Sequence, residues 1–137
     1  MTSTVISHPP RVIAYYAKER AAYPAAYSLK LTDEHAKKIV RKLCNHFIPK
    51  NHGFHLVGVE LNFHGNRQNG RARLNGTITL SHTPSLGLIC HEVGHLVDIA
   101  TRKPSFRKRN WHTKHLMRIV GKLIAYCQKK NLWSTHQ

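Results

Sequence analysis

The segment LGLICHEVGHLVDIA, residues 86–100, places His91, Glu92 and His95 in an HExxH pattern. Side chains four residues apart on a helix lie one turn above each other, so both imidazoles can bind one metal ion. Glu92 lies about 100° further round, within reach of a metal-bound water but not aimed at the metal. Zinc lowers the pKa of such a water, and a carboxylate can take its proton. The pattern predicts Zn2+ as cofactor, His91 and His95 as ligands, and Glu92 as general base.

A catalytic zinc site usually takes three protein ligands, and the acidic residues offer no good third one. No glutamate follows Glu92, and the only later acid is Asp98. Asp98 lies seven residues past His91, about 10.5 Å along a helix axis, which would strain a bond to the same ion. We expect Asp98 either to hydrogen-bond a ligand histidine or an arginine, or to be an ordinary structural aspartate.

Three later histidines remain as candidates for the third ligand. His112 and His115 lie in NWHTKHLMRIV, where the next helix is expected to begin. They are three residues apart and share a helix face, so spacing alone does not choose between them. His136 lies in a tail that we expect to be frayed, and it is a poor candidate.

Hydrophobic periodicity and turn residues predict the elements that must position these side chains. We expect a single α+β domain over residues 1–137, with residues 1–10 frayed and a small antiparallel sheet. The expected helices cover residues 11–22, 31–47, 84–101 and 111–130, and the expected strands cover 54–63 and 71–81. Four of the five tyrosines lie in residues 15–27. They could stack on nucleic acid bases, but packing of the first helix on the core is favoured.

Four residues mark particular points in these elements. Thr32 is expected to cap the second helix, and Thr83, followed by a proline, is expected to cap the third. Gly76 suggests a bulge or a close backbone approach within the second strand. Gly94 is costly in a helix interior, and it is understandable if another segment of backbone passes close to it.

The charge balance points to a polyanionic partner. The chain has 22 Lys and Arg against 6 Asp and Glu, a formal net charge of +16. Nucleic acid is the first candidate partner and an anionic membrane surface the second. The alternative without a binding partner is that the positive charge only keeps the protein in solution. The predicted DNA contacts lie in one loop and on one face of the last helix: Arg102, Lys103, Arg107, Lys108, Arg109, Lys114, Arg118 and Lys122.

The cysteines and the hydropathy of the sequence indicate the cellular compartment of the protein. Cys44, Cys90 and Cys127 are odd in number and widely spaced, so we expect buried thiols and no disulfide framework. No apolar run is long enough for a membrane span, and the N-terminus lacks the apolar run of a secretory signal. We therefore expect a cytoplasmic protein, or one at the nucleoid or in the nucleus if it binds DNA, with no membrane association.

The successive segments NGRARLNGTITLS, LICHEVGHLVD and WHTKHLMRIV together resemble the SprT-like metalloprotease domain over about residues 54–123. The resemblance implies a zincin-like domain, in which an HExxH active-site helix is followed by a ligand-bearing helix. It assigns the third-ligand position to His112, although Thr113 stands where the family usually has glycine. The three widely spaced cysteines cannot supply the zinc ribbon that often follows the domain, so we expect the minimal form of the domain. The resemblance further implies a zinc metalloendopeptidase whose substrates are DNA-associated or DNA-crosslinked proteins.

A different class of function stays open alongside this one. The chain could be a basic nucleic-acid-binding module whose zinc site is structural or vestigial. Such a site would be closed by a fourth ligand, for which His115 is the candidate. Metal-dependent hydrolysis of a bond other than a peptide bond is a third, weaker alternative.

Overall fold

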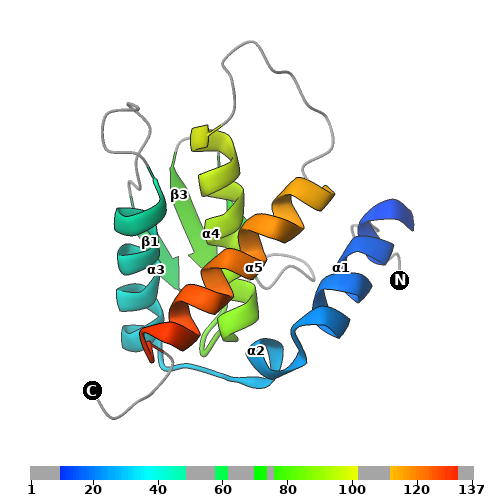
Figure 1. Ribbon diagram of the computed structural model, residues 1–137. Helices are drawn as coiled ribbons and strands as arrows, with labels where there is room; N and C mark the ends of the chain where they lie inside the picture. The colour runs from blue at the N-terminus through cyan, green and yellow to red at the C-terminus, as the bar shows by residue number, and fades with distance from the viewer. Residues whose placement is uncertain (1–9, 49–57, 62–69, 74–75, 102–111, 133–137) are drawn as a thin grey trace, which may run out of the picture.

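The computed structural model describes residues 10–48, 58–61, 70–73, 76–101 and 112–132. The protein is α+β, mostly helical, with a small three-stranded mixed sheet. Figure 1 shows the elements in chain order: α1 (Pro10–Ala22), α2 (Pro24–Ser28), α3 (Asp33–Phe47), β1 (Gly58–Leu61), β2 (Gly70–Ala72), β3 (Thr77–Leu80), α4 (Leu86–Thr101) and α5 (Lys114–Lys129).

Helix α4 lies at the centre of the molecule. Twelve of its sixteen residues are buried, because α5, α3, α2 and the sheet all pack around it (Figure 1). Gly94 is where α5 comes closest: a Cβ added there would lie 3.0 Å from Val120 Cγ2 and 3.3 Å from Leu116 Cδ1. The expectation that another backbone passes close to Gly94 is not met: the atoms that come close belong to side chains of α5.

The four predicted helices are all present, and the structure adds the one-turn α2. Thr32 caps α3 as predicted, because its side chain accepts a hydrogen bond from the His35 N–H at 3.2 Å. Helix α1 already includes Pro10, one residue before the predicted start at residue 11. Residues 1–9, also expected to be frayed, lie outside the described residues.

Two predicted helix starts need correction. Helix α4 begins at Leu86, and Ser85 is its cap, because the Ser85 hydroxyl accepts a hydrogen bond from the Leu88 N–H. Thr83 instead adopts a left-handed conformation with φ of 43°, and its N–H donates to Asp33. Helix α5 begins at Lys114 rather than near residue 111, since the Thr113 side chain caps it.

The predicted antiparallel pair of strands is wrong in two respects. The sheet order is β1-β3-β2, with β1 parallel and β2 antiparallel to β3. The expected strand 71–81 is a hairpin, because Gly76 adopts a φ of 91° and its N–H donates to the Arg73 carbonyl in a tight turn. The fifteen residues between Leu61 and Thr77 let the chain form the edge strand β2 and return through the middle strand β3.

The three cysteines are buried and free, as predicted. Burial raises the pKa of the Cys44 thiol to about 12, so this group stays a neutral apolar neighbour at physiological pH. No helix in the described part of the chain combines the length and the apolar character that a membrane crossing requires.

Candidate metal centre

Three histidines from two separate segments meet beside α4. His91 and His95 lie on successive turns of α4, and His112 lies just before the Thr113 cap of α5. One nitrogen of each ring lies within 4.8 Å of the nitrogens of the other two. The ring centroids are 4.8 Å apart for His91 and His95, 5.4 Å for His91 and His112, and 5.0 Å for His95 and His112. The three side chains lie close enough to bind a metal ion.

The packing of α5 on α4 holds this arrangement together. Gly94, adjacent to His95 in the chain, allows Leu116 and Val120 of α5 to lie against α4. The Thr113 hydroxyl accepts a hydrogen bond from the Leu116 N–H at 3.1 Å, which fixes where α5 begins. His112 directly precedes that cap, so the helix start sets its position relative to the two histidines of α4.

The spacing of the nitrogens fits a metal ion after a small adjustment. Two nitrogens that each lie about 2.05 Å from a tetrahedral zinc are roughly 3.4 Å apart. The upper limit of 4.8 Å in the structure exceeds this separation by about 1.4 Å, which small side-chain rotations can close. Imidazole nitrogens are donors that suit zinc, copper, iron and nickel, so the ligand type leaves the identity of the metal open.

The two nitrogens of His91 have different environments. Its Nδ1–H donates a 2.8 Å hydrogen bond to Glu19 Oε2, whereas its Nε2 is buried and makes no hydrogen bond within the described residues. Burial alone would lower the pKa of His91, but the bond to Glu19 and the charge of Glu92 raise it on balance. A buried imidazole nitrogen of this kind needs a partner, and a bound cation would supply one.

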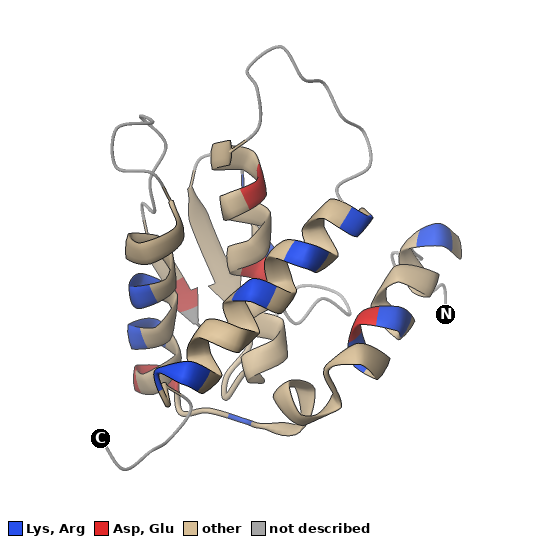
Figure 2. Ribbon diagram, viewed as in Figure 1, with Lys and Arg blue, Asp and Glu red and all other residues tan. Residues whose placement is uncertain are grey.

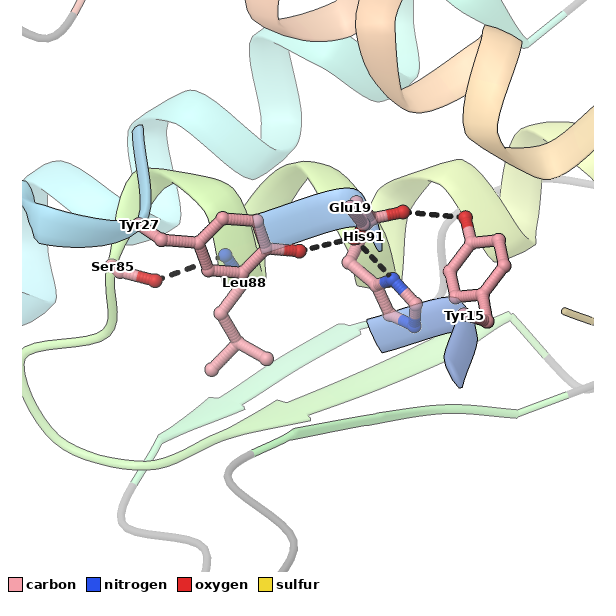
Figure 3. A network of polar contacts seen from close by, with 6 residues as sticks. All are labelled: Tyr15, Glu19, Tyr27, Ser85, Leu88 and His91. Carbon is pink, nitrogen blue, oxygen red and sulfur yellow. Dashed lines mark hydrogen bonds and ion pairs between the residues drawn. The ribbon is translucent and has the colours of Figure 1, made fainter. Parts of the chain in front are cut away.

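Glu19 is a site residue that sequence reasoning missed. It lies on α1, is 0% exposed, and also accepts hydrogen bonds from the hydroxyls of Tyr15, at 2.5 Å, and Tyr27 (Figure 3). Burial raises the pKa of this carboxyl, but the bonds from His91, Tyr15 and Tyr27 outweigh burial and lower it overall. The available signal was its position: Val12, Tyr15 and Glu19 follow a helical repeat that places the acid on the buried face of α1.

Glu92 is also nearly inaccessible to solvent and lies outside the histidine cluster. Its carboxylate accepts a hydrogen bond from the Ala72 N–H of β2. Burial is the main reason that the pKa of Glu92 is raised; the nearby charge of Glu19 adds to this effect, while His91 and the Ala72 N–H oppose it. A buried carboxyl with a raised pKa is a suitable acceptor for a proton near neutral pH.

Two tyrosines of α1 cover the histidines. The Tyr15 ring lies 5.3 Å from the His112 ring and the Tyr16 ring lies 5.0 Å from the His91 ring. Tyr15 is buried and Tyr16 half-buried, so α1 keeps solvent away from this side of the cluster. The favoured expectation, that the tyrosines near the N-terminus pack the first helix onto the core, is confirmed for Tyr15.

His115 does not join the cluster. Within the described residues, the group of potential metal ligands is His91, His95 and His112. His115 Nε2 lies 3.7 Å from Asp98 Oδ1, with a side chain that is 54% exposed, whereas Asp98 is fully buried. Asp98 therefore pairs with a histidine outside the cluster. His136 lies outside the described residues.

The described basic residues of the predicted DNA contacts lie along α5. Figure 2 shows cationic positions spaced along this helix. We call three exposed ones the α5 basic stripe: Lys114, Arg118 and Lys122. The stripe begins two residues after His112. The other predicted contacts, in the segment 102–109, lie outside the described residues.

Comparison of the chain with known protein families, with curated proteins and with solved structures finds no match.

Proposed function

We propose that this protein is a zinc metalloendopeptidase with a zincin-like domain similar to the SprT-like proteases. The observation that carries the proposal is the meeting of His91, His95 and His112 beside Glu92, the residue that follows the first of them on α4. The HExxH spacing predicted His91 and His95 as ligands and Glu92 as general base, and the family resemblance assigned His112 as the third ligand. The proximity of His112 to the two histidines of α4 is what the HExxH spacing alone could not supply.

The composition of the cluster favours a catalytic site over a structural one. Structural zinc sites are almost always closed by four protein ligands, whereas catalytic ones have three and keep a position for water or substrate. The potential ligands among the described residues number three, and His115 pairs with Asp98 instead. This set supports the peptidase over the alternative of a binding module with a closed zinc site.

The residues of the site have complementary roles in peptide hydrolysis. The three histidines hold the ion, which when bound supplies Lewis acidity that polarises a carbonyl and lowers the pKa of water. Glu92 accepts the proton of the attacking water on its carboxylate and passes it to the departing amine nitrogen. Its raised pKa suits both transfers. Tyr15 and Tyr16 exclude bulk water from one side, which strengthens the electrostatic interactions within the site.

The charge of the chain supports DNA-associated or DNA-crosslinked proteins as the substrates. The net charge is +16, and the α5 basic stripe begins beside the candidate ligand His112. Phosphate contacts made by such a stripe position a duplex or a single strand without reading its sequence. A protein attached to that DNA would then be held close to Glu92 and the histidines.

The test compares Glu92→Gln with the wild-type protein. The variant is expected to keep its zinc content and to lose proteolysis by about 10²–10⁴-fold, because the water loses its general base. Zinc content is measured by elemental analysis, and cleavage of casein or histone is measured with and without single-stranded DNA. Glu34→Gln, at an exposed position on α3, is the control and should match the wild type in both assays. Undiminished cleavage by Glu92→Gln would rule out the proposed peptidase.

A further inference from the structure

A buried carboxylate on α1 has no role in the chemistry described above. Glu19 is 0% exposed and comes from a segment 72 residues before the histidine that it contacts. A carboxylate without partners is strongly unfavourable in a protein interior, so its presence requires matched donors. The donors are the hydroxyls of Tyr15 and Tyr27 and the Nδ1–H of His91.

We infer that Glu19 is a positioning residue, which orients His91 and fixes its tautomer so that Nε2 is the metal ligand. The inference deepens the proposed function and rests on its metal site. In a neutral imidazole one nitrogen carries the proton and the other carries the lone pair that binds a metal. The Nδ1–H bond to Glu19 assigns the proton to Nδ1 and leaves the lone pair on Nε2, the buried nitrogen.

Both oxygens of the Glu19 carboxylate accept hydrogen bonds. Tyr15, one turn earlier on α1, donates to Oε1, and Tyr27 on α2 donates to Oε2, which also accepts from His91 (Figure 3). Both phenols keep their protons at any physiological pH, because burial raises the pKa of Tyr15 and Tyr27. Rotation of the carboxylate would break several of these bonds together, so the orientation of His91 is set by a rigid partner.

The negative charge of Glu19 adds an electronic effect to the geometric one. A carboxylate that accepts the second N–H of a ligand histidine raises the basicity of the ligating nitrogen, and loss of such a partner typically lowers metal affinity 10–100-fold. Helices α1 and α2 are thereby part of the metal site, although they supply no ligand. The structural alternative is that the bond only fastens α1 to α4, in which case metal affinity would not depend on it.

The experiment measures zinc affinity by chelator competition for the wild type, Glu19→Gln and the control Glu34→Gln. Glutamine keeps the size of the side chain but removes the charge, so we expect a 10–100-fold loss of affinity for Glu19→Gln and none for the control. Circular dichroism of the metal-free proteins checks that both variants are folded. Equal zinc affinity in a folded Glu19→Gln variant would overturn the inference while leaving the proposed function intact.

A second measurement needs no variant. In the zinc-loaded wild-type protein, the side-chain nitrogen resonances of His91 should show a protonated Nδ1 and a metal-bound Nε2. Coordination through Nδ1 would overturn the inference, because that nitrogen could not then donate to Glu19. A wild-type protein that binds no zinc would remove the metal site and the inference together. Reduced zinc affinity of Glu19→Gln, in a protein whose Glu92→Gln variant cleaves substrate as fast as the wild type, would keep the inference and reject the proposed peptidase.

Discussion

Replacing Gly94 by alanine tests whether the contact between α4 and α5 is as tight as the structure indicates. The new Cβ would lie 3.0 Å from Val120 Cγ2 and 3.3 Å from Leu116 Cδ1. Carbon atoms prefer a separation of about 3.5–4.0 Å, so the two contacts are short by roughly 0.5–1.0 Å and 0.2–0.7 Å. Either the side chains of α5 must shift or the helix itself must move.

Two effects of opposite sign decide the result. Alanine in place of glycine within a helix stabilises the folded state by about 1 kcal/mol. An extra methyl group in a well-packed core costs typically 1–3 kcal/mol. We expect a net loss of about 1 kcal/mol in the free energy of unfolding, because neither neighbour lies at the end of a long flexible side chain. For a chain of this length that loss lowers the Tm by about 3–5 °C.

The assay is thermal unfolding of the metal-free protein, with zinc affinity measured in parallel. Gly58→Ala is the matched control, since a Cβ at Gly58 meets nothing within 4 Å, and its Tm should change little. We also expect Gly94→Ala to bind zinc more weakly, because a displaced α5 moves His112 away from the two histidines of α4. A Tm for Gly94→Ala above that of the wild type would mean that helix propensity outweighs packing, and would refute the argument.

Three further predictions address the ligands, the charge and the pH dependence. His112→Ala should reduce zinc affinity by more than about 100-fold, whereas His115→Ala should leave zinc content close to that of the wild type, and elemental analysis of both decides. Replacing all three residues of the α5 basic stripe by glutamate should weaken DNA binding and reduce the slope of log affinity against log salt by about 2 units for single strands. If fluorescence anisotropy gives the same slope for the variant and the wild type, the stripe is not part of the DNA-binding surface. Hydrogen bonds from the Thr83 N–H and His82 hold the pKa of Asp33 below its usual range. The ionised Asp33 should therefore stabilise the folded state fully above the ordinary carboxyl pKa, and this stabilisation should be lost as the pH falls through the lowered pKa. Denaturant unfolding of the wild type and Asp33→Asn at pH 7 and pH 3 should show a difference at pH 7 that shrinks at pH 3, and a constant difference would contradict the assignment.

The helices could be predicted from the sequence because their signals are local. The apolar repeat of α3 and the Thr32 cap lie within a few residues of each other, and both are present in the structure. The starts of α4 and α5 were misplaced by two or three residues, because Thr83, Ser85 and Thr113 are all plausible caps and tertiary contacts choose among them. The sheet could not be predicted, since the parallel pairing of β1 with β3 depends on how fifteen intervening residues return.

In the candidate site, too, local relationships could be predicted from the sequence and long-range ones could not. His91 and His95 share a face by helical spacing alone, so their proximity followed from the sequence. The choice of His112 over His115 required the resemblance to a known family, and the structure places His112 in the cluster. The repeat on α1 could have marked Glu19 as buried, but its partner could not be predicted, because the contact with His91 spans 72 residues.

Salt concentration should separate two kinds of charge in this molecule. The α5 basic stripe is exposed, and dissolved ions screen such charges over about 8–10 Å at moderate ionic strength. The pair formed by Glu19 and His91 has side-chain exposures of 0% and 1%, so ions in solution cannot approach it. Val12 and Tyr15 are the buried apolar residues of α1, and the attachment of this helix therefore depends heavily on the shielded carboxylate. A high-salt wash that strips bound nucleic acid should leave α1 seated over the histidines.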